Sequence, residues 1–262
     1  MNSDSSYSPP VDRLLTYKDC RKLKKWPNYP ELFGFTAEHI PDLIRMATDP
    51  ALNWADSDSL EVWAPIHAWR ALGQLHTEAA IAPLLSVADE LEESEWFGEE
   101  LPEVFALIGA AAIQPCKNFL ADNSHPFHSR ITAAFCLEKI GNTHPELRSE
   151  CVAALTEQLS HFQKNSPELN GFLVSYLLDL KAVESASTME RAFAAKWVDD
   201  SIAGDWLDVQ YLLGLISRAE LRERRFTVDA EHLAKKATNP IAAPPRGFGG
   251  TRKLSSKKSK KK

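Results

Sequence analysis

The feature that most constrains the fold of this chain is a short apolar helical run, a break and a second apolar run. Residues 62–85 read VWAPIHAWRALGQLHTEAAIAPLL. Ile66, Trp69 and Leu72 recur at the spacing typical of one face of a helix. Gly73 is expected to break this helix before the second apolar run begins. The stretch therefore predicts two helices joined by a tight turn.

Three later stretches repeat this pattern. Residues 106–120, ALIGAAAIQPCKNFL, carry Gly109 as the expected break, and their Ile-Gln-Pro follows the first Ile-Ala-Pro by 32 residues (81 to 113). Residues 131–162 repeat the pattern with Gly141, and residues 169–197 repeat it with an expected turn at Lys181 in place of the glycine. No unit carries enough apolar surface to enclose a core alone, whereas four stacked units bury a continuous core.

The pattern A-L-G-x-L-x-x-x-x-A-I-x-P-L-L at residues 71–85 resembles the short HEAT-type repeats of phycobilisome lyases and other helical-repeat proteins. The resemblance covers residues 36–216, and the fourth unit departs from it with Leu178 where the glycine would fall. It implies an all-α fold, an α-solenoid of about four HEAT-like helical hairpins that form an armadillo-type superhelix. Such solenoids serve mostly as scaffolds and only a few carry enzymes, so the resemblance informs the fold more than the function.

Composition divides the chain into four predicted parts. Residues 1–12 are rich in Ser and Pro and are expected to be disordered, whereas the apolar residues that follow them are expected to fold over the first repeat. Thr36 is expected to cap the first helix of the repeats, and residues 51–59 are expected to form a loop. The parts are an N-terminal extension (1–35), the repeat domain (36–216), a charged helix (217–238) and a disordered lysine-rich tail (239–262).

Charge is distributed unevenly along the chain. The net charge is −6, and because the last eleven residues contain seven cations and no acid, residues 1–251 carry −13. An acidic body disfavours a nucleic-acid-binding groove, whose affinity would come mainly from neutralising phosphates. Binding of nucleic acid, an acidic protein or anionic lipid through the tail stays open, and the basic residues concerned are Arg252, Lys253, Lys257, Lys258, Lys260, Lys261 and Lys262.

Cysteine usage and hydropathy indicate the compartment. Cys20, Cys116, Cys136 and Cys151 form no C-x-x-C motif and follow no recognisable signal peptide, so free thiols in a reducing compartment are expected. The last three lie on apolar helical faces and are expected to be core residues rather than nucleophiles. No run reaches the roughly eighteen apolar residues that cross a bilayer. The sequence predicts a cytoplasmic protein without a membrane span.

Residues 89–100, DELEESEWFGEE, have the most unusual local composition, with seven acids and no base. One interpretation is an acidic helix end and loop whose two aromatic residues pack into the repeats. The other is an acidic rim with an aromatic anchor for a basic partner, since buried aromatic residues often supply the strongest interface contacts. The lysine tail of the chain is one such basic segment. The candidate interaction surface comprises Glu92, Glu93, Glu95, Trp96, Phe97, Trp63 and His67.

The histidines form no recognisable catalytic or metal-binding set. His125 and His128 have a spacing that would suit two metal ligands on one helix face, but Pro126 between them and the lack of further ligands favour an exposed loop. His67 lies between two tryptophans and is expected to be partly buried with its nitrogens satisfied locally, the alternative being a stacking or proton-transfer site. The chain contains no His-Glu dipeptide of the kind that deoxyhypusine hydroxylases use for iron, no G-x-S-x-G and no G-x-x-x-x-G-K-[ST].

The sequence therefore predicts a non-catalytic protein-binding scaffold or adaptor without cofactor or metal. Stacked helices would hold its surface rigid, so that little ordering entropy is lost on binding. Two alternatives stay open. The first is a bilin lyase-like or tetrapyrrole-handling protein, suggested only by the type of repeat. The second is nucleic-acid binding driven by the tail, through Lys257, Lys258, Lys260, Lys261 and Lys262. The partner and the oligomeric state are not indicated.

Overall fold

The computed structural model describes residues 7–227, and within them every regular element is a helix, which confirms the all-α class. The chain divides into two units, Met1–Arg218 and Ala219–Lys262. The α-helices of the first unit are α1 (Tyr29–Phe33), α2 (Ile40–Ala47), α3 (Pro50–Asn53), α4 (Ala64–Gln74), α5 (Ile81–Ser86), α6 (Glu95–Ile108), α7 (Ile113–Ala121), α8 (Phe127–Thr143), α9 (Arg148–Ser160), α10 (Pro167–Asp179), α11 (Ala186–Ala194), α12 (Asp200–Ala203) and α13 (Trp206–Leu212). Short 3₁₀ helices accompany them: η1 (Val11–Thr16), η2 (Cys20–Lys22), η3 (Ala37–His39), η4 (Glu61–Trp63), η5 (Glu78–Ala80), η6 (Ala110–Ala112) and η7 (Val183–Ser185).

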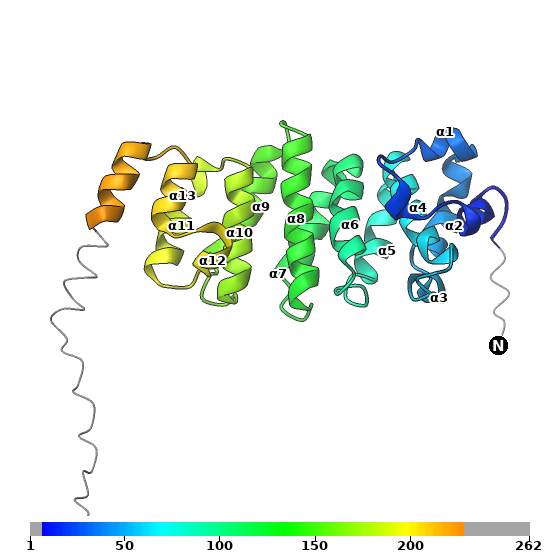
Figure 1. Cartoon of the computed structure of the whole chain (residues 1–262), viewed down its shortest axis with the longest axis horizontal. Coiled ribbons are helices and arrows are strands. Elements are labelled where there is room, and N and C mark those ends of the chain that lie inside the picture. Colours follow the sequence, from blue (N-terminus) through cyan, green and yellow to red (C-terminus); the bar gives the residue numbers. More distant parts are fainter. Residues whose placement is uncertain (1–6, 228–262) are drawn as a thin grey trace, which may run out of the picture. The chain divides into compact units, whose positions relative to one another are not determined.

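The helices of the first unit pack in two layers. Helices α4, α6, α8 and α10 lie side by side in Figure 1, and each packs against the next. Helix α2 extends this first layer beyond α4, and α12 extends it beyond α10. Helices α5, α7, α9 and α11 follow one another in the same way in the second layer, and α8 contacts both α7 and α9. Each repeated stretch of the sequence thus contributes one helix to each layer.

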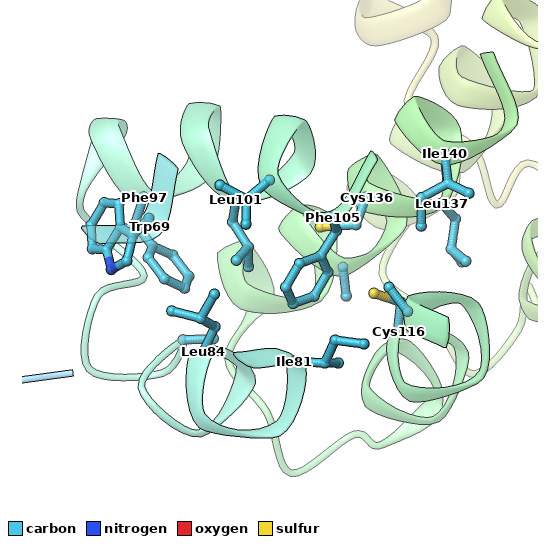
Figure 2. Packing of buried hydrophobic residues seen from close by; sticks show 14 of the residues in the cluster. Trp69, Ile81, Leu84, Phe97, Leu101, Phe105, Cys116, Cys136, Leu137 and Ile140 are labelled. Carbon is cyan, nitrogen blue, oxygen red and sulfur yellow. The ribbon is translucent and has the colours of Figure 1, made fainter. Parts of the chain in front are cut away.

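One continuous hydrophobic cluster fills the space between the layers. Figure 2 shows Ile81 and Leu84 of α5 facing Leu101 and Phe105 of α6. The hydrophobic cluster extends in the same way between the next two helices, where Cys116 of α7 lies close to Cys136 of α8. Side chains of one pair thus pack on those of the next, and this sharing gives each short helix more buried area than its own partner alone would supply.

Two of the glycines that the sequence marks as helix breaks lie inside helices. Gly73 is within α4 and Gly141 is within α8, so the prediction of a break at these positions is wrong. Both positions need a small residue because another element approaches closely. A Cβ atom at Gly141 would lie 2.8 Å from Leu180 Cδ2 and 3.2 Å from Cys151 Cβ. Gly109 is a true break, since its φ of 82° ends α6.

The turns that do end the helices are made by other residues. His76, Lys181 and Lys196 have φ values of 49°, 53° and 59° and follow the last residues of α4, α10 and α11. In each turn the backbone N–H of the following residue donates a hydrogen bond to a carbonyl in the last turn of the helix. For example, the N–H of Ala182 donates to the carbonyl of Leu177 at 2.9 Å. This is the Schellman arrangement, which satisfies carbonyls at a helix end and usually has glycine at the left-handed position.

The N-terminal segment packs against α4. Its elements η1 and α1 both contact that helix, and among its buried side chains are Leu14 and Tyr29, each with no exposed surface. The prediction that residues 7–12 are disordered is wrong. Tyr7 is buried and its hydroxyl donates a hydrogen bond to Asp49 at 2.7 Å, and Val11 lies in the core. Apolar contacts of these two side chains outweigh the Ser- and Pro-rich composition around them.

Two further boundaries differ from the sequence-based expectation. Residues 51–59 are not entirely loop, because α3 begins at Pro50 and Asp49 caps it by accepting a hydrogen bond from the amide of Ala51. The charged helix predicted for residues 217–238 is present over residues 218–227, and its remainder lies outside the described residues. The same holds for the tail at residues 239–262. No helix in the described part has the length and apolarity to span a membrane.

Candidate interaction site

A cavity of about 290 Å³ opens at the surface beside the acidic segment of residues 89–100. The end of α3, the 3₁₀ helix η4 and the start of α6 converge on it. Four of the seven tryptophans of the chain line it, and most of its wall is apolar. We call it the tryptophan cavity. Its walls are formed by Arg21, Asn53, Trp54, Ser57, Val62, Trp63, Ile66, Trp69, Leu91, Ser94 and Trp96.

The indole rings are held at defined angles. Trp63 and Trp96 meet edge to face, with ring centroids 5.3 Å apart and an interplanar angle of 81°. Trp69 contacts Phe97 in the same manner at 5.3 Å, and its indole N–H donates to the carbonyl of Ala47 at 2.8 Å. Edge-to-face pairs of this kind add to the energy of area burial and fix the rings. The cavity wall is therefore largely preformed.

Trp54 differs from the other three tryptophans because 63% of its surface is exposed. It follows the last residue of α3, and its backbone N–H donates a hydrogen bond to the carbonyl of Pro50 at 3.1 Å. Its exposed ring extends the apolar wall of the cavity to the surface, and a contiguous apolar patch of this kind is a candidate binding surface.

Arg21 forms one wall of the tryptophan cavity. Its guanidinium carbon lies 4.8 Å from the ring centroid of Trp63, a cation–π contact. The same guanidinium donates to both oxygens of Asp19 at 2.8–3.1 Å. These hydrogen bonds lower the pKa of Asp19 below its ordinary value. Asp19 thus holds a positive charge in place against the aromatic wall.

A second hollow, of about 460 Å³, lies on the other side of the acidic segment. We call it the acidic hollow. Carboxylates of the segment form one wall, and side chains of α8 form the opposite wall. Ser94 lines both hollows, and its hydroxyl caps α6 by accepting a hydrogen bond from the amide of Phe97 at 3.3 Å. The residues around the acidic hollow are Glu92, Glu93, Ser94, Glu95, Gly98, His128, Ile131, Thr132 and Phe135.

The structure brings together most of the residues that the sequence marked as a candidate surface. Trp63 and Trp96 line the tryptophan cavity, whereas the carboxylates of the acidic segment, Glu92, Glu93 and Glu95, line the acidic hollow. Phe97 lies behind them, only 2% exposed, and supports Trp69 rather than facing solvent. His67 lies on α4 and reaches neither hollow. The lysine tail lies outside the described residues.

His67 is completely buried under the N-terminal segment. Its Nε2 lies 2.7 Å from the carbonyl of Lys18 and therefore donates, while its Nδ1 lies 2.6 Å from the hydroxyl of Tyr29 and accepts. Burial lowers the pKa of His67 to about 4. A neutral ring with both nitrogens bonded is suited to holding the N-terminal segment on α4 and is unsuited to proton transfer at neutral pH.

Arg70 and Glu100 form a buried ion pair between α4 and α6. Their side chains are 4% and 9% exposed, and the guanidinium donates to both carboxylate oxygens. Burial alone would lower the pKa of Arg70, but the hydrogen bonds and the charge of Glu100 outweigh it and raise that pKa. The ring of Trp26 covers the guanidinium at 5.2 Å. The pair belongs to the interior and does not face either hollow.

His125 and the four cysteines line neither hollow. His125 precedes α8 rather than lying in it, stacks on Phe119 with centroids 3.6 Å apart, and has its Nδ1 2.9 Å from Asp89. No group of three or more His, Cys, Asp or Glu side chains suited to a metal exists within residues 7–227. All four thiols are buried, and burial raises the pKa of Cys20 and of Cys151 to about 12.

Of the residues that line the tryptophan cavity, sequence reasoning marked only Trp63 and Trp96; Trp54 and Arg21 are among those that it missed. Trp54 stands among polar residues in a stretch interpreted as loop, where the sequence does not indicate whether its ring is buried or exposed. Arg21 had no signal either, because 42 residues (21 to 63) separate it from the Trp63 ring that it contacts. Only the folding of the N-terminal segment onto the repeats places it there.

No protein-family model, no curated protein and no solved structure matches this chain.

Proposed function

We propose that this protein is a non-catalytic protein-binding scaffold or adaptor built as a HEAT-like α-solenoid of about four hairpins. The observation that carries the proposal is the tryptophan cavity, with exposed Trp54 at its edge and the acidic hollow beside it. Surfaces that combine aromatic anchors with a polar rim are characteristic of protein interfaces.

The repeat architecture supports the proposal. Successive helix pairs add to both layers in the same order, and each pair contacts the neighbouring pairs. This is the packing expected of solenoid repeats, in which nearest-neighbour contacts supply the stability and a surface extends along the layers. The resemblance of residues 71–85 to short HEAT-type repeats points to the same architecture.

The rigidity of the site gives the proposed mechanism. The edge-to-face pairs fix Trp63 and Trp69, and Asp19 fixes the guanidinium of Arg21. Side chains already held in their bound arrangement lose little rotamer entropy when a partner arrives. The scaffold would therefore bind by presenting a preformed surface, without a covalent step.

Affinity capture with matched surface variants tests the proposal. Full-length wild type, Trp54→Ala and Tyr211→Ala are used as baits, and bound proteins are quantified by mass spectrometry. Tyr211 is also an exposed aromatic residue, 38% accessible, but lies in α13. We expect Trp54→Ala to recover the partner at least about fivefold less, the loss typical of an interface anchor, and Tyr211→Ala to recover it as wild type does. The absence of any stoichiometric partner, or equal recovery by all three baits, would contradict the proposal.

A further inference from the structure

We infer that the partner of this site is a basic peptide segment that inserts one large apolar side chain into the tryptophan cavity and lays an adjacent lysine or arginine in the acidic hollow. The inference rests on the proposed scaffold function and specifies the chemistry of its partner. It follows from the different character of the two hollows.

The tryptophan cavity suits an apolar group. Its volume of about 290 Å³ lies at the lower limit of ligand cavities, roughly 300–1,000 Å³, and has room for a single large side chain. Within residues 7–227, Arg21 is the one charged residue that lines it, and its guanidinium already covers the Trp63 ring and is paired with Asp19. A further cation would lose its hydration against a mostly apolar wall whose described residues include no carboxylate, whereas a leucine or phenylalanine side chain would contact the indole rings without this cost.

The acidic hollow suits a cation. Residues 89–103 contain eight acidic and no basic side chains. Glu100 is neutralised by Arg70, and Glu103 is paired with Lys139 at 2.7 Å. Among residues 7–227 no ion pair neutralises the three carboxylates that line the hollow, Glu92, Glu93 and Glu95.

The wall opposite the carboxylates supports the same assignment. The Phe135 ring and the Ile131 side chain form part of it, and the charge of Lys139, whose Nζ lies 5.3 Å from the centroid of that ring, is neutralised by Glu103. An ammonium or guanidinium group in the hollow would therefore have carboxylates on one side and aromatic and aliphatic surface for its methylene stem on the other. A lysine or arginine fits both walls, whereas an acidic residue would be repelled.

Ser94 connects the two hollows and determines how the segment is arranged. Because this residue lines both, the two hollows adjoin, and neighbouring positions of one peptide can supply an apolar side chain to one and a basic side chain to the other. The three carboxylates also predict salt-sensitive binding, since exposed charges are screened within about 10 Å at 0.1 M ionic strength.

Fluorescence anisotropy with labelled peptides tests the inference on the full-length protein. The probe is the fluorescein-labelled peptide KKKLKKK, compared with KKKGKKK and EEELEEE at low and at 0.5 M salt. We expect KKKLKKK to bind at least about fivefold more tightly than KKKGKKK, EEELEEE not to bind, and the affinity for KKKLKKK to fall at least about fivefold at high salt.

Variants assign the binding to the two hollows. Trp54→Ala should weaken KKKLKKK at least about fivefold with little effect on KKKGKKK. The triple variant Glu92→Gln, Glu93→Gln, Glu95→Gln should weaken both peptides and reduce the dependence on salt. The matched control replaces three exposed acids in other helices, Glu150, Glu168 and Glu190, by Gln and should bind as wild type does.

Three outcomes would overturn the inference: equal binding of the leucine and glycine peptides, equal loss in the control triple variant, or binding that appears only when residues 251–262 are removed. The last result would assign the site to the chain's own lysine run. If capture still depends on Trp54 while KKKLKKK does not bind, the scaffold proposal stands and the partner chemistry is wrong. If KKKLKKK binds as expected but no partner protein is captured, the result contradicts the scaffold proposal alone.

Discussion

At the scale of single residues, the polar groups of the interior hold elements together. His67 is an example, because it accepts from Tyr29 and donates to the carbonyl of Lys18, both in the N-terminal segment, while it belongs to α4. The sequence places a histidine between two tryptophans but contains no signal of either partner, since both bonds join residues 38 or more positions apart. Its role could be assigned only from the folded chain.

The pKa of His67 predicts a pH dependence of stability. Burial lowers that pKa to about 4, whereas the unfolded value is about 6.5. The unfolded state therefore binds the proton first, so the contribution of His67 is complete above about pH 6.5 and is lost as the pH falls toward 4. We expect wild type to lose about 3 kcal/mol more than His67→Gln between these limits. Urea unfolding of both proteins at pH 7.5, 6.0, 5.0 and 4.0 measures the difference, and parallel curves would contradict it.

At the scale of elements, the turns show what sequence patterns can and cannot predict. The apolar spacing of the four repeated stretches correctly indicated helices, because burial of one face dominates the choice of these residues. The breaks were harder to locate. The turn expected at Lys181 is present, but Gly73 and Gly141 lie within helices where α6 and Leu180 approach, and Lys196 takes a left-handed position that the sequence did not indicate. Glycine is used both for positive φ and for close packing, and the sequence does not distinguish the two.

The left-handed lysines predict a stabilising substitution. Lys181 has a φ of 53° and an exposed side chain, so its Cβ costs energy that glycine would not. We expect Lys181→Gly to raise the free energy of unfolding by about 0.5–1 kcal/mol. Glu190→Gly, at an exposed site inside α11, is the matched control and should lower it by about 1 kcal/mol. Thermal unfolding of the two variants should give shifts of opposite sign.

At the scale of the whole molecule, the all-α class and the packing of the apolar N-terminal segment on the first repeat were predictable, whereas the order of residues 7–12 was not. Residues 1–12 look disordered by composition, yet Tyr7 and Val11 join the core that begins with α2 and α4. The candidate site was predictable in part. Clustered acids identified its acidic wall, whereas Trp54 and Arg21 join it only through contacts between distant segments. Long-range contacts leave no periodic trace in a sequence, which is why this part was missed.

If the N-terminal segment is part of the same cooperative unit, a core substitution there must destabilise the whole unit. Leu14 has no exposed surface, so Leu14→Ala should lower the free energy of unfolding by about 2–5 kcal/mol. Leu32→Ala, at a position 45% exposed in the same segment, should change it by no more than about 0.5 kcal/mol. Circular dichroism and tryptophan fluorescence should report one coincident transition. A separate early transition in Leu14→Ala would show that the segment unfolds independently.

The buried pair of Arg70 and Glu100 has a consequence for how α4 and α6 are aligned. Apolar helix faces of similar composition can slide past one another at modest cost, since leucine against leucine is favourable in several offsets. A slide of one turn, about 5.4 Å, would part this guanidinium from its carboxylate and leave two unpaired charges away from water. That penalty selects a single offset between adjacent repeats, and with it the edge-to-face contact of Trp63 and Trp96 in the wall of the cavity.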